Sequence, residues 1–61
     1  MNMDKALAVI DGVTLDQRFE GFVETMEYIN ENYDDVQPEV RVAFRTVKSG
    51  LRRIFAAQED A

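Results

Sequence analysis

The stretches EGFVETMEYINE, residues 20–31, and VRVAFRTVKSGLR, residues 40–52, decide the fold of this chain. Large apolar residues recur in both at alternating steps of four and three, the spacing that places side chains on one face of a helix. The first series comprises Leu15, Phe19, Phe22, Met26, Ile29 and Tyr33, and the second comprises Val40, Phe44, Val47, Leu51 and Ile54, with Phe55 beside it. The two series predict long helices over about 15–33 and 38–57.

Capping residues place the ends of these helices and predict a shorter helix before them, over about 3–11. Gly12 suits the residue that follows a helix, because glycine readily adopts a left-handed conformation. Thr14 and Gln17 have the spacing of a capping box, so the next helix is expected to begin at Leu15. Pro38 fits the first turn of the last helix, where its missing N–H group is not needed.

Two heptad helices joined by a short turn are expected to fold back on each other as an antiparallel hairpin. The apolar positions then pair in register across the turn, from Tyr33 opposite Val40 to Phe22 opposite Leu51. Val23, Ala43 and Gly50 widen the apolar surface beyond what two helices can cover. The sequence therefore predicts an all-α fold, a short N-terminal helix plus an antiparallel hairpin, that dimerises into a helical bundle. Gly50 is interpreted as a point of close approach by another helix, or alternatively as a kink.

Charged residues follow the same spacing as the apolar ones. Glutamates on the first long helix face bases on the second in the same hairpin register, as Glu31 with Arg41, Glu27 with Arg45, Glu24 with Lys48 and Glu20 with Arg52. This pattern predicts a charge zipper that selects register more than it stabilises the fold, because exposed ion pairs contribute little. The alternative is two ordinary solvated faces.

Size and composition favour self-association. A chain of 61 residues without Cys or His is expected to form one domain, residues 1–61, with a marginal core and neither a disulfide nor a zinc site. A second copy is then the expected source of additional buried surface. The net charge of −5 is uneven, since residues 41–61 carry five bases against two acids. No signal peptide or apolar stretch of membrane-spanning length is evident, so a cytoplasmic protein that does not enter membranes is expected.

Catalytic and metal-binding patterns are not found in the sequence. The acyl-transfer dyads and triads that depend on His or Cys cannot form, and the three glycines are isolated rather than grouped in a phosphate-binding loop. The glutamate ladder lacks the Glu-x-x-His pairs of di-iron helical bundles. We therefore expect no enzyme activity and no cofactor.

Two charged surfaces remain as candidates for binding. The acidic one supplies partner-binding candidates, together with an aromatic residue on the back of the same helix: Glu20, Glu24, Glu27, Tyr28 and Glu31. Such an acidic stripe could also resemble nucleic-acid phosphates. The basic one supplies anion-binding candidates: Arg41, Arg45, Lys48, Arg52 and Arg53. Val42 also lies where the pattern calls for a polar residue, and would mark a partner site if it shared a patch with Tyr28.

The sequence thus favours a non-enzymatic protein–protein interaction module, a small acidic homodimer that binds and inhibits or modulates another macromolecule. In size, acidity and lack of cysteine it resembles, as a class, the inhibitors that phages and other mobile elements make against host machinery. One alternative is a binder of a nucleotide or nucleic acid through the basic residues of the last helix. Another is a purely structural assembly module.

Overall fold

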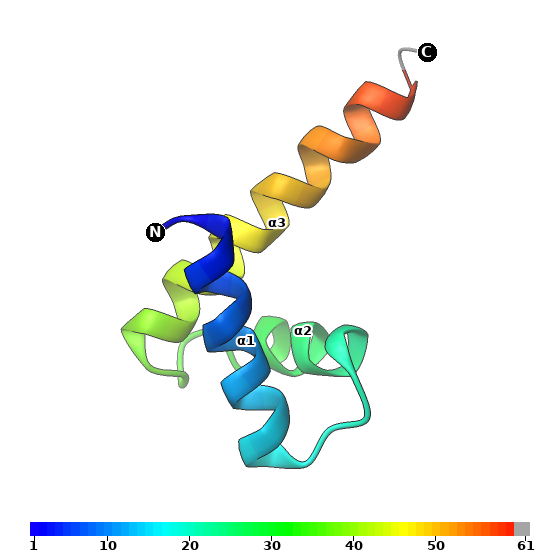
Figure 1. The fold of residues 1–61 in the computed structure, drawn as a ribbon. Coiled ribbons are helices and arrows are strands. Elements are labelled where there is room, and N and C mark those ends of the chain that lie inside the picture. The colour runs from blue at the N-terminus through cyan, green and yellow to red at the C-terminus, as the bar shows by residue number, and fades with distance from the viewer. Residues whose placement is uncertain (60–61) are drawn as a thin grey trace.

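The chain folds into three α-helices, α1 (Met3–Gln17), α2 (Phe22–Glu31) and α3 (Pro38–Glu59) (Figure 1). The structure, a computed structural model, describes residues 1–59, with side chains up to residue 56. This confirms the all-α class and the number of helices. Among the described residues, no helix has the length and apolar character needed to span a membrane.

The N-terminal helix is longer than the sequence predicted. Instead of stopping before Gly12, α1 continues to Gln17 and ends at Arg18, which adopts the left-handed conformation (φ 58°) and donates its N–H to the carbonyl of Leu15. Thr14 is therefore an interior residue of α1, and the predicted capping box does not form. The actual N-terminal cap is Asn2, whose Oδ1 accepts a hydrogen bond from the Lys5 N–H at 2.8 Å. Continuing the helix allows Val13 to pack against the core, which offsets the cost of a helical glycine.

The second helix is correspondingly shorter, because the chain is extended at Gly21 (φ −177°, ψ −172°), the N-cap of α2. The segment 18–21 therefore interrupts the predicted helix 15–33. Glu24 stabilises the new start, since its Oε2 accepts a hydrogen bond from the Glu20 N–H at 2.9 Å. At the other end, the N–H of Asn32 closes the last turn on the Tyr28 carbonyl.

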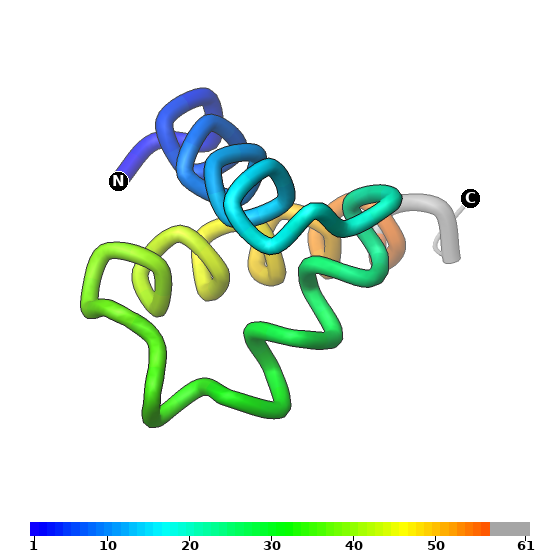
Figure 2. The backbone as a smooth tube through the Cα atoms, turned by 90° about the horizontal axis from the view of Figure 1, so that it is seen from below, coloured from blue at the N-terminus to red at the C-terminus, as the bar shows by residue number. Residues whose placement is uncertain are grey.

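The third helix begins at Pro38, where the sequence placed it, and the Gln37 carbonyl accepts the first helical hydrogen bond, from Arg41 N–H. The predicted hairpin, with α2 and α3 paired along their length, is not observed. Most contacts of α3 with other helices are to α1, and its contacts with α2 are the fewest. Seen from below, α1 lies across α3, and α2 diverges from α3 toward the segment that connects the two (Figure 2). The last turns of α3 extend beyond α1 and α2 (Figure 1).

The core lies where the three helices meet and is small. Its buried apolar side chains come from all three helices: Ala6, Ile10, Ile29, Ala43, Phe44 and Val47. Met26, Tyr33, Val40 and Leu51 are partly buried against it. Four members of the predicted apolar series are exposed instead: Leu15, Phe22, Ile54 and Phe55. The seam predicted for α2 and α3 therefore supplies half of the core, while α1 and Ala43 supply the other half.

A pair of threonines joins α1 to α2 inside this core. Thr25 is completely buried, and its Oγ1 lies 2.7 Å from Oγ1 of Thr14. Thr14 Oγ1 is also 3.0 Å from the Ile10 carbonyl, and Thr25 Oγ1 is 3.0 Å from the Gly21 carbonyl. Because two hydroxyl groups carry only two protons, two of these three contacts are hydrogen-bonded at any moment.

The predicted close approach at Gly50 is confirmed, and the approaching group is Met3 of α1. A Cβ atom added to Gly50 would overlap the terminal methyl group of Met3. Glycine at this position therefore lets the beginning of α1 lie against the middle of α3.

Candidate functional site

Three concavities stand out on the surface of the described residues, and the one between α2 and α3 is distinguished by exposed apolar side chains. We call this concavity, of about 460 Å³, the apolar groove; it is lined by Phe22, Val23, Met26, Glu27, Asn30, Phe44, Lys48 and Leu51. Val23 is 68% exposed and Phe22 is 37% exposed. Burying exposed apolar surface of this kind is a main source of binding free energy in protein association.

The projecting end of α3 continues the groove. Phe44, Lys48, Leu51 and Phe55 follow one another at helical spacing and therefore share one face of α3. Phe55 is 59% exposed and its neighbour Ile54 is 54% exposed. We call the apolar groove together with Ile54 and Phe55 the apolar face.

The predicted charge zipper does not form among the described residues, and three of its eight members make other contacts. Glu24 accepts the hydrogen bond that starts α2. Lys48 places its Nζ 5.7 Å from the centre of the Phe44 ring, which is within the range of a cation–π contact. Arg41 donates from Nη1 to the Val36 carbonyl at 2.7 Å. The observed crossing of α2 and α3 thus replaces the hairpin register that the zipper required.

Among the candidate partner-binding residues, Tyr28 lies apart from the glutamates, three of which share one face of α2 at helical spacing: Glu24, Glu27 and Glu31. Glu27 lies at the edge of the apolar groove and Glu24 serves as a cap. Tyr28 is half-buried, with its ring centroid 5.2 Å from that of Phe19, and it faces a different concavity. Glu20 and Glu31 are exposed on either side of these residues.

The five basic candidates lie at four separate places on the structure. Arg41 holds the turn before α3, and Lys48 borders the apolar groove. Arg45 and Arg53 line a concavity of about 600 Å³ beside the beginning of α1, together with Ser49. Arg52 is exposed and belongs to neither concavity. Val42 lines the same concavity as Arg45, so it shares no patch with Tyr28.

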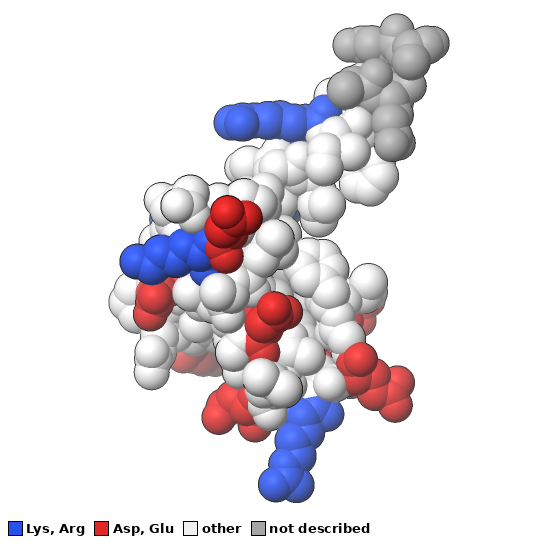
Figure 3. Space-filling model, viewed as in Figure 1, with Lys and Arg blue, Asp and Glu red and all other residues white. Residues whose placement is uncertain are grey.

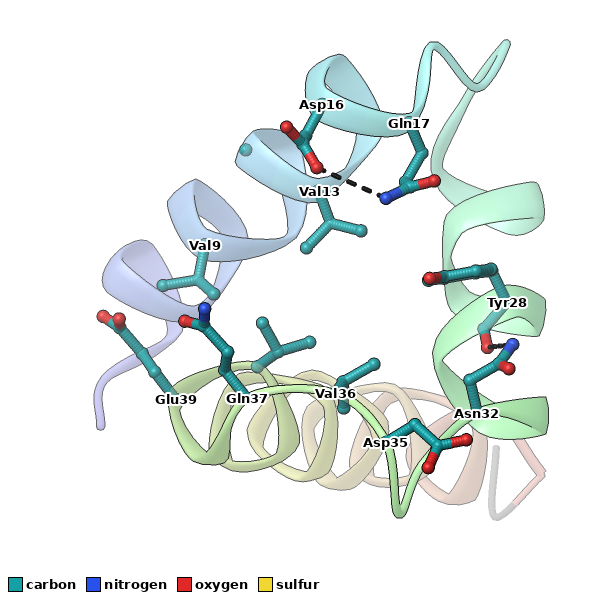
Figure 4. A pocket seen from close by; sticks show the side chains of 12 residues that line it. Val9, Val13, Asp16, Gln17, Tyr28, Asn32, Asp35, Val36, Gln37 and Glu39 are labelled. Carbon is teal, nitrogen blue, oxygen red and sulfur yellow. Dashed lines mark hydrogen bonds between the residues drawn. The ribbon is translucent and has the colours of Figure 1, made fainter.

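A third concavity, of about 610 Å³, lies between α1, α2 and the segment that leads into α3. Val9 and Val13 of α1 point into it opposite Tyr28 of α2 and Asn32, the residue that follows α2 (Figure 4). Its polar groups are held locally, since Gln17 Nε2 donates to Asp16 Oδ2 at 3.3 Å and Asn32 Nδ2 donates to the Tyr28 carbonyl at 2.9 Å. Residues 1–59 contain no group of three or more carboxylates placed to hold a metal ion.

The surface seen in Figure 3 carries acidic and basic side chains scattered among large uncharged areas, and uncharged atoms predominate on the projecting part of α3. The sequence assigned Phe22, Ile54 and Phe55 to a covered seam, yet they are exposed. Reasoning from the sequence did not find the concavity beside α1, because it depends on how the N-terminal residues cross α3. The spacing of Arg45, Ser49 and Arg53, each four residues after the last, is the signal that could have indicated it.

Comparisons of the chain with protein-family models, with curated protein sequences and with solved structures gave no match.

Proposed function

We propose that this chain is a non-enzymatic protein–protein interaction module whose apolar face binds a helix of another polypeptide. The observation that carries this proposal is the continuity of the apolar groove with the exposed Ile54 and Phe55 on the projecting end of α3. A groove between two helices that is lined by aromatic and aliphatic side chains is a common receptor for an amphipathic helix.

The overall dimensions support this proposal, because the chain is less compact and exposes more surface than a typical monomer of its size. The radius of gyration is 12.0 Å, compared with about 10.5 Å expected for a compact chain of this length. The accessible surface is 4655 Å² for 7.0 kDa, which exceeds the typical value for a compact monomer of that mass by roughly 600 Å². That excess approaches the roughly 800 Å² that each partner buries in a standard protein–protein interface.

We propose in addition that the assembled protein inhibits or modulates a macromolecule that docks on its charged outer surface. The support for this is the net charge of −5 and the exposure of Glu20, Glu27 and Glu31. Small acidic inhibitors of phages and mobile elements are the class that it resembles in these respects.

A designed amphipathic peptide provides the test of the apolar face. The peptide has about 20 residues, with leucines at heptad spacing and lysines elsewhere, so that it is long enough to form a helix. The peptide is titrated into fluorescently labelled protein. The protein is kept at nanomolar concentration, so that its copies do not associate with one another. We expect saturable binding of the peptide. The substitution Phe22→Asp should lower the affinity tenfold or more, which is on the order of the effect of losing one central interface residue.

Leu15→Asp is the matched control, because Leu15 is an apolar helical residue that is 79% exposed and lies outside the apolar face. This control should bind the peptide as the unmodified protein does. Absence of binding by the unmodified protein, or equal weakening by both substitutions, would contradict the proposed function.

Anion binding is the second candidate function, favoured by the position of Arg45, Ser49 and Arg53 around one concavity. Two guanidinium groups and a hydroxyl group can together hold a phosphate group. If this site binds a nucleotide, Arg45→Glu should abolish binding while Arg52→Glu, outside the concavity, should preserve it. Titration with ATP and with inorganic phosphate, at low and at high salt, measures the difference.

A further inference from the structure

We infer that the polypeptide bound by the apolar face is a second copy of this chain, with the projecting end of each α3 seated in the apolar groove of the other. This inference rests on the proposed function, because it names the partner of the same surface. The groove and the segment that would enter it are both present on one chain and adjoin at Leu51. A two-fold symmetric pair can therefore fill both grooves at once.

The stability of the projecting helix is the first argument for a second copy. α3 is helical to Glu59, although its described side chains after Leu51, residues 52–56, are all exposed. A helical segment of this length has little stability in water unless its apolar side is covered. Phe55 from one chain, lying against Phe44 and Leu51 of the other, would provide that cover in both directions.

Charge complementarity is the second argument. The charged residues of α2 are all glutamates, whereas the projecting part of α3 carries Arg52 and Arg53 beside Ile54 and Phe55. Entry of this segment into the groove of another copy brings its arginines alongside the glutamates of that copy's α2. The charge zipper predicted within one chain is thus replaced by attraction between two chains, which sets orientation and speeds association.

Two-fold symmetry fixes how the two copies of α3 run relative to each other. Residue 55 of each chain must reach the groove residues at positions 44–51 of the other, so the two copies of α3 run antiparallel. The two-fold axis then passes near the midpoint of these positions, close to Leu51. A single cysteine at this position should lie opposite itself, within the separation that a disulfide bridges.

The first test measures self-association directly, by titrating fluorescently labelled protein with unlabelled protein and following anisotropy. We expect saturable binding, and Phe55→Asp should weaken it at least about 30-fold, the loss typical of a central interface residue. Leu15→Asp should leave the affinity unchanged. Both substituted side chains are exposed, so neither substitution should disturb the core. Circular dichroism checks that both variants remain folded.

Cysteine cross-linking is the second test, and it is simple because the chain contains no cysteine. Mild oxidation should convert Leu51→Cys into a disulfide-linked pair, whereas Leu15→Cys should remain unlinked. Equal linking of both variants, or self-association that is insensitive to Phe55→Asp, would overturn the inference.

The outcomes separate the inference from the proposed function. Protein that fails to bind its own copies but still binds the designed peptide overturns the second copy as partner and retains the interaction module. Protein that binds neither overturns both.

Discussion

The hydroxyl oxygens of Thr14 and Thr25 lie 2.7 Å apart and join α1 to α2 within the core. Thr25 is the fully buried polar residue of the described chain, and the contact exists only because α1 continues past Gly12. This contact therefore depends on the extension of α1 past Gly12, the feature in which the fold departs most from the one predicted from the sequence. It adds a polar contact between α1 and α2 to the apolar contacts that the buried Ile29 makes in the core.

We predict that these two hydroxyl groups are energetically coupled. Replacing both residues by valine, singly and together, retains the side-chain shape and removes the hydrogen bond. In a double-mutant cycle of unfolding free energies, the coupling should be about 1 kcal/mol. Chemical denaturation followed by circular dichroism measures it. Additive effects of the two substitutions would mean that the contact contributes nothing to stability.

The smallness of the core predicts strong effects of single truncations. Ile10 is fully buried, so Ile10→Ala should cost about 2 to 5 kcal/mol. A chain of this length is stable by only about 3 to 9 kcal/mol, so this substitution should remove a large part of its stability and lower its melting temperature markedly.

Leu15→Ala is the matched control for this truncation, because Leu15 begins the apolar series of the sequence but is 79% exposed. It should change stability by no more than about 0.5 kcal/mol. Thermal denaturation of the two variants distinguishes the observed core from the one that the heptad pattern predicted, in which Leu15 is a seam residue.

Two glutamates of the same ladder should have opposite effects on stability. Glu24 accepts a hydrogen bond at the start of α2, so Glu24→Ala should destabilise the protein by about 1 kcal/mol. Glu31 ends α2, where a negative charge opposes the helix dipole and no basic residue is present in the last turn. Glu31→Gln should therefore stabilise by about 0.3 to 1 kcal/mol. A Glu24→Ala variant as stable as the unmodified protein would contradict the capping role of Glu24, and a destabilised Glu31→Gln variant would contradict the dipole argument for Glu31.

The glycines offer a further comparison. Gly12 lies inside α1 with open space around its Cα, so Gly12→Ala should stabilise the protein by up to about 1 kcal/mol. Gly21→Ala should instead destabilise slightly, because alanine is a poorer N-cap than glycine. Melting temperatures of the two variants, measured side by side, test the helix boundaries. A loss of stability in Gly12→Ala would contradict the continuous α1.

Periodicity predicted the all-α class and the start of α3, because Pro38 and the regular apolar spacing act locally. It could not predict that α1 would extend through Gly12, since a glycine favours a helix end unless tertiary packing outweighs it. The burial of Val13 and the contact between Thr14 and Thr25 supply that packing here. Pairing α2 with α3 by register alone also failed, because α1 occupies much of the surface that the hairpin needed.

The candidate site was predictable only in part. The apolar pattern identified Phe22, Leu51, Ile54 and Phe55, but as members of a covered seam. Leu51 is partly buried, whereas Phe22, Ile54 and Phe55 are exposed, because α2 and α3 do not pair along their length as the hairpin required. The concavity lined by Arg45 and Arg53 depends on where the N-terminal residues cross α3, which spacing does not encode.

Sedimentation equilibrium of the unmodified chain over a range of concentrations tests the central claim most directly. We predict a mass approaching twice 7.0 kDa as the concentration rises, with dissociation at low concentration and in Phe55→Asp. A mass of 7.0 kDa at every concentration would contradict the account of the apolar face as the contact between two copies.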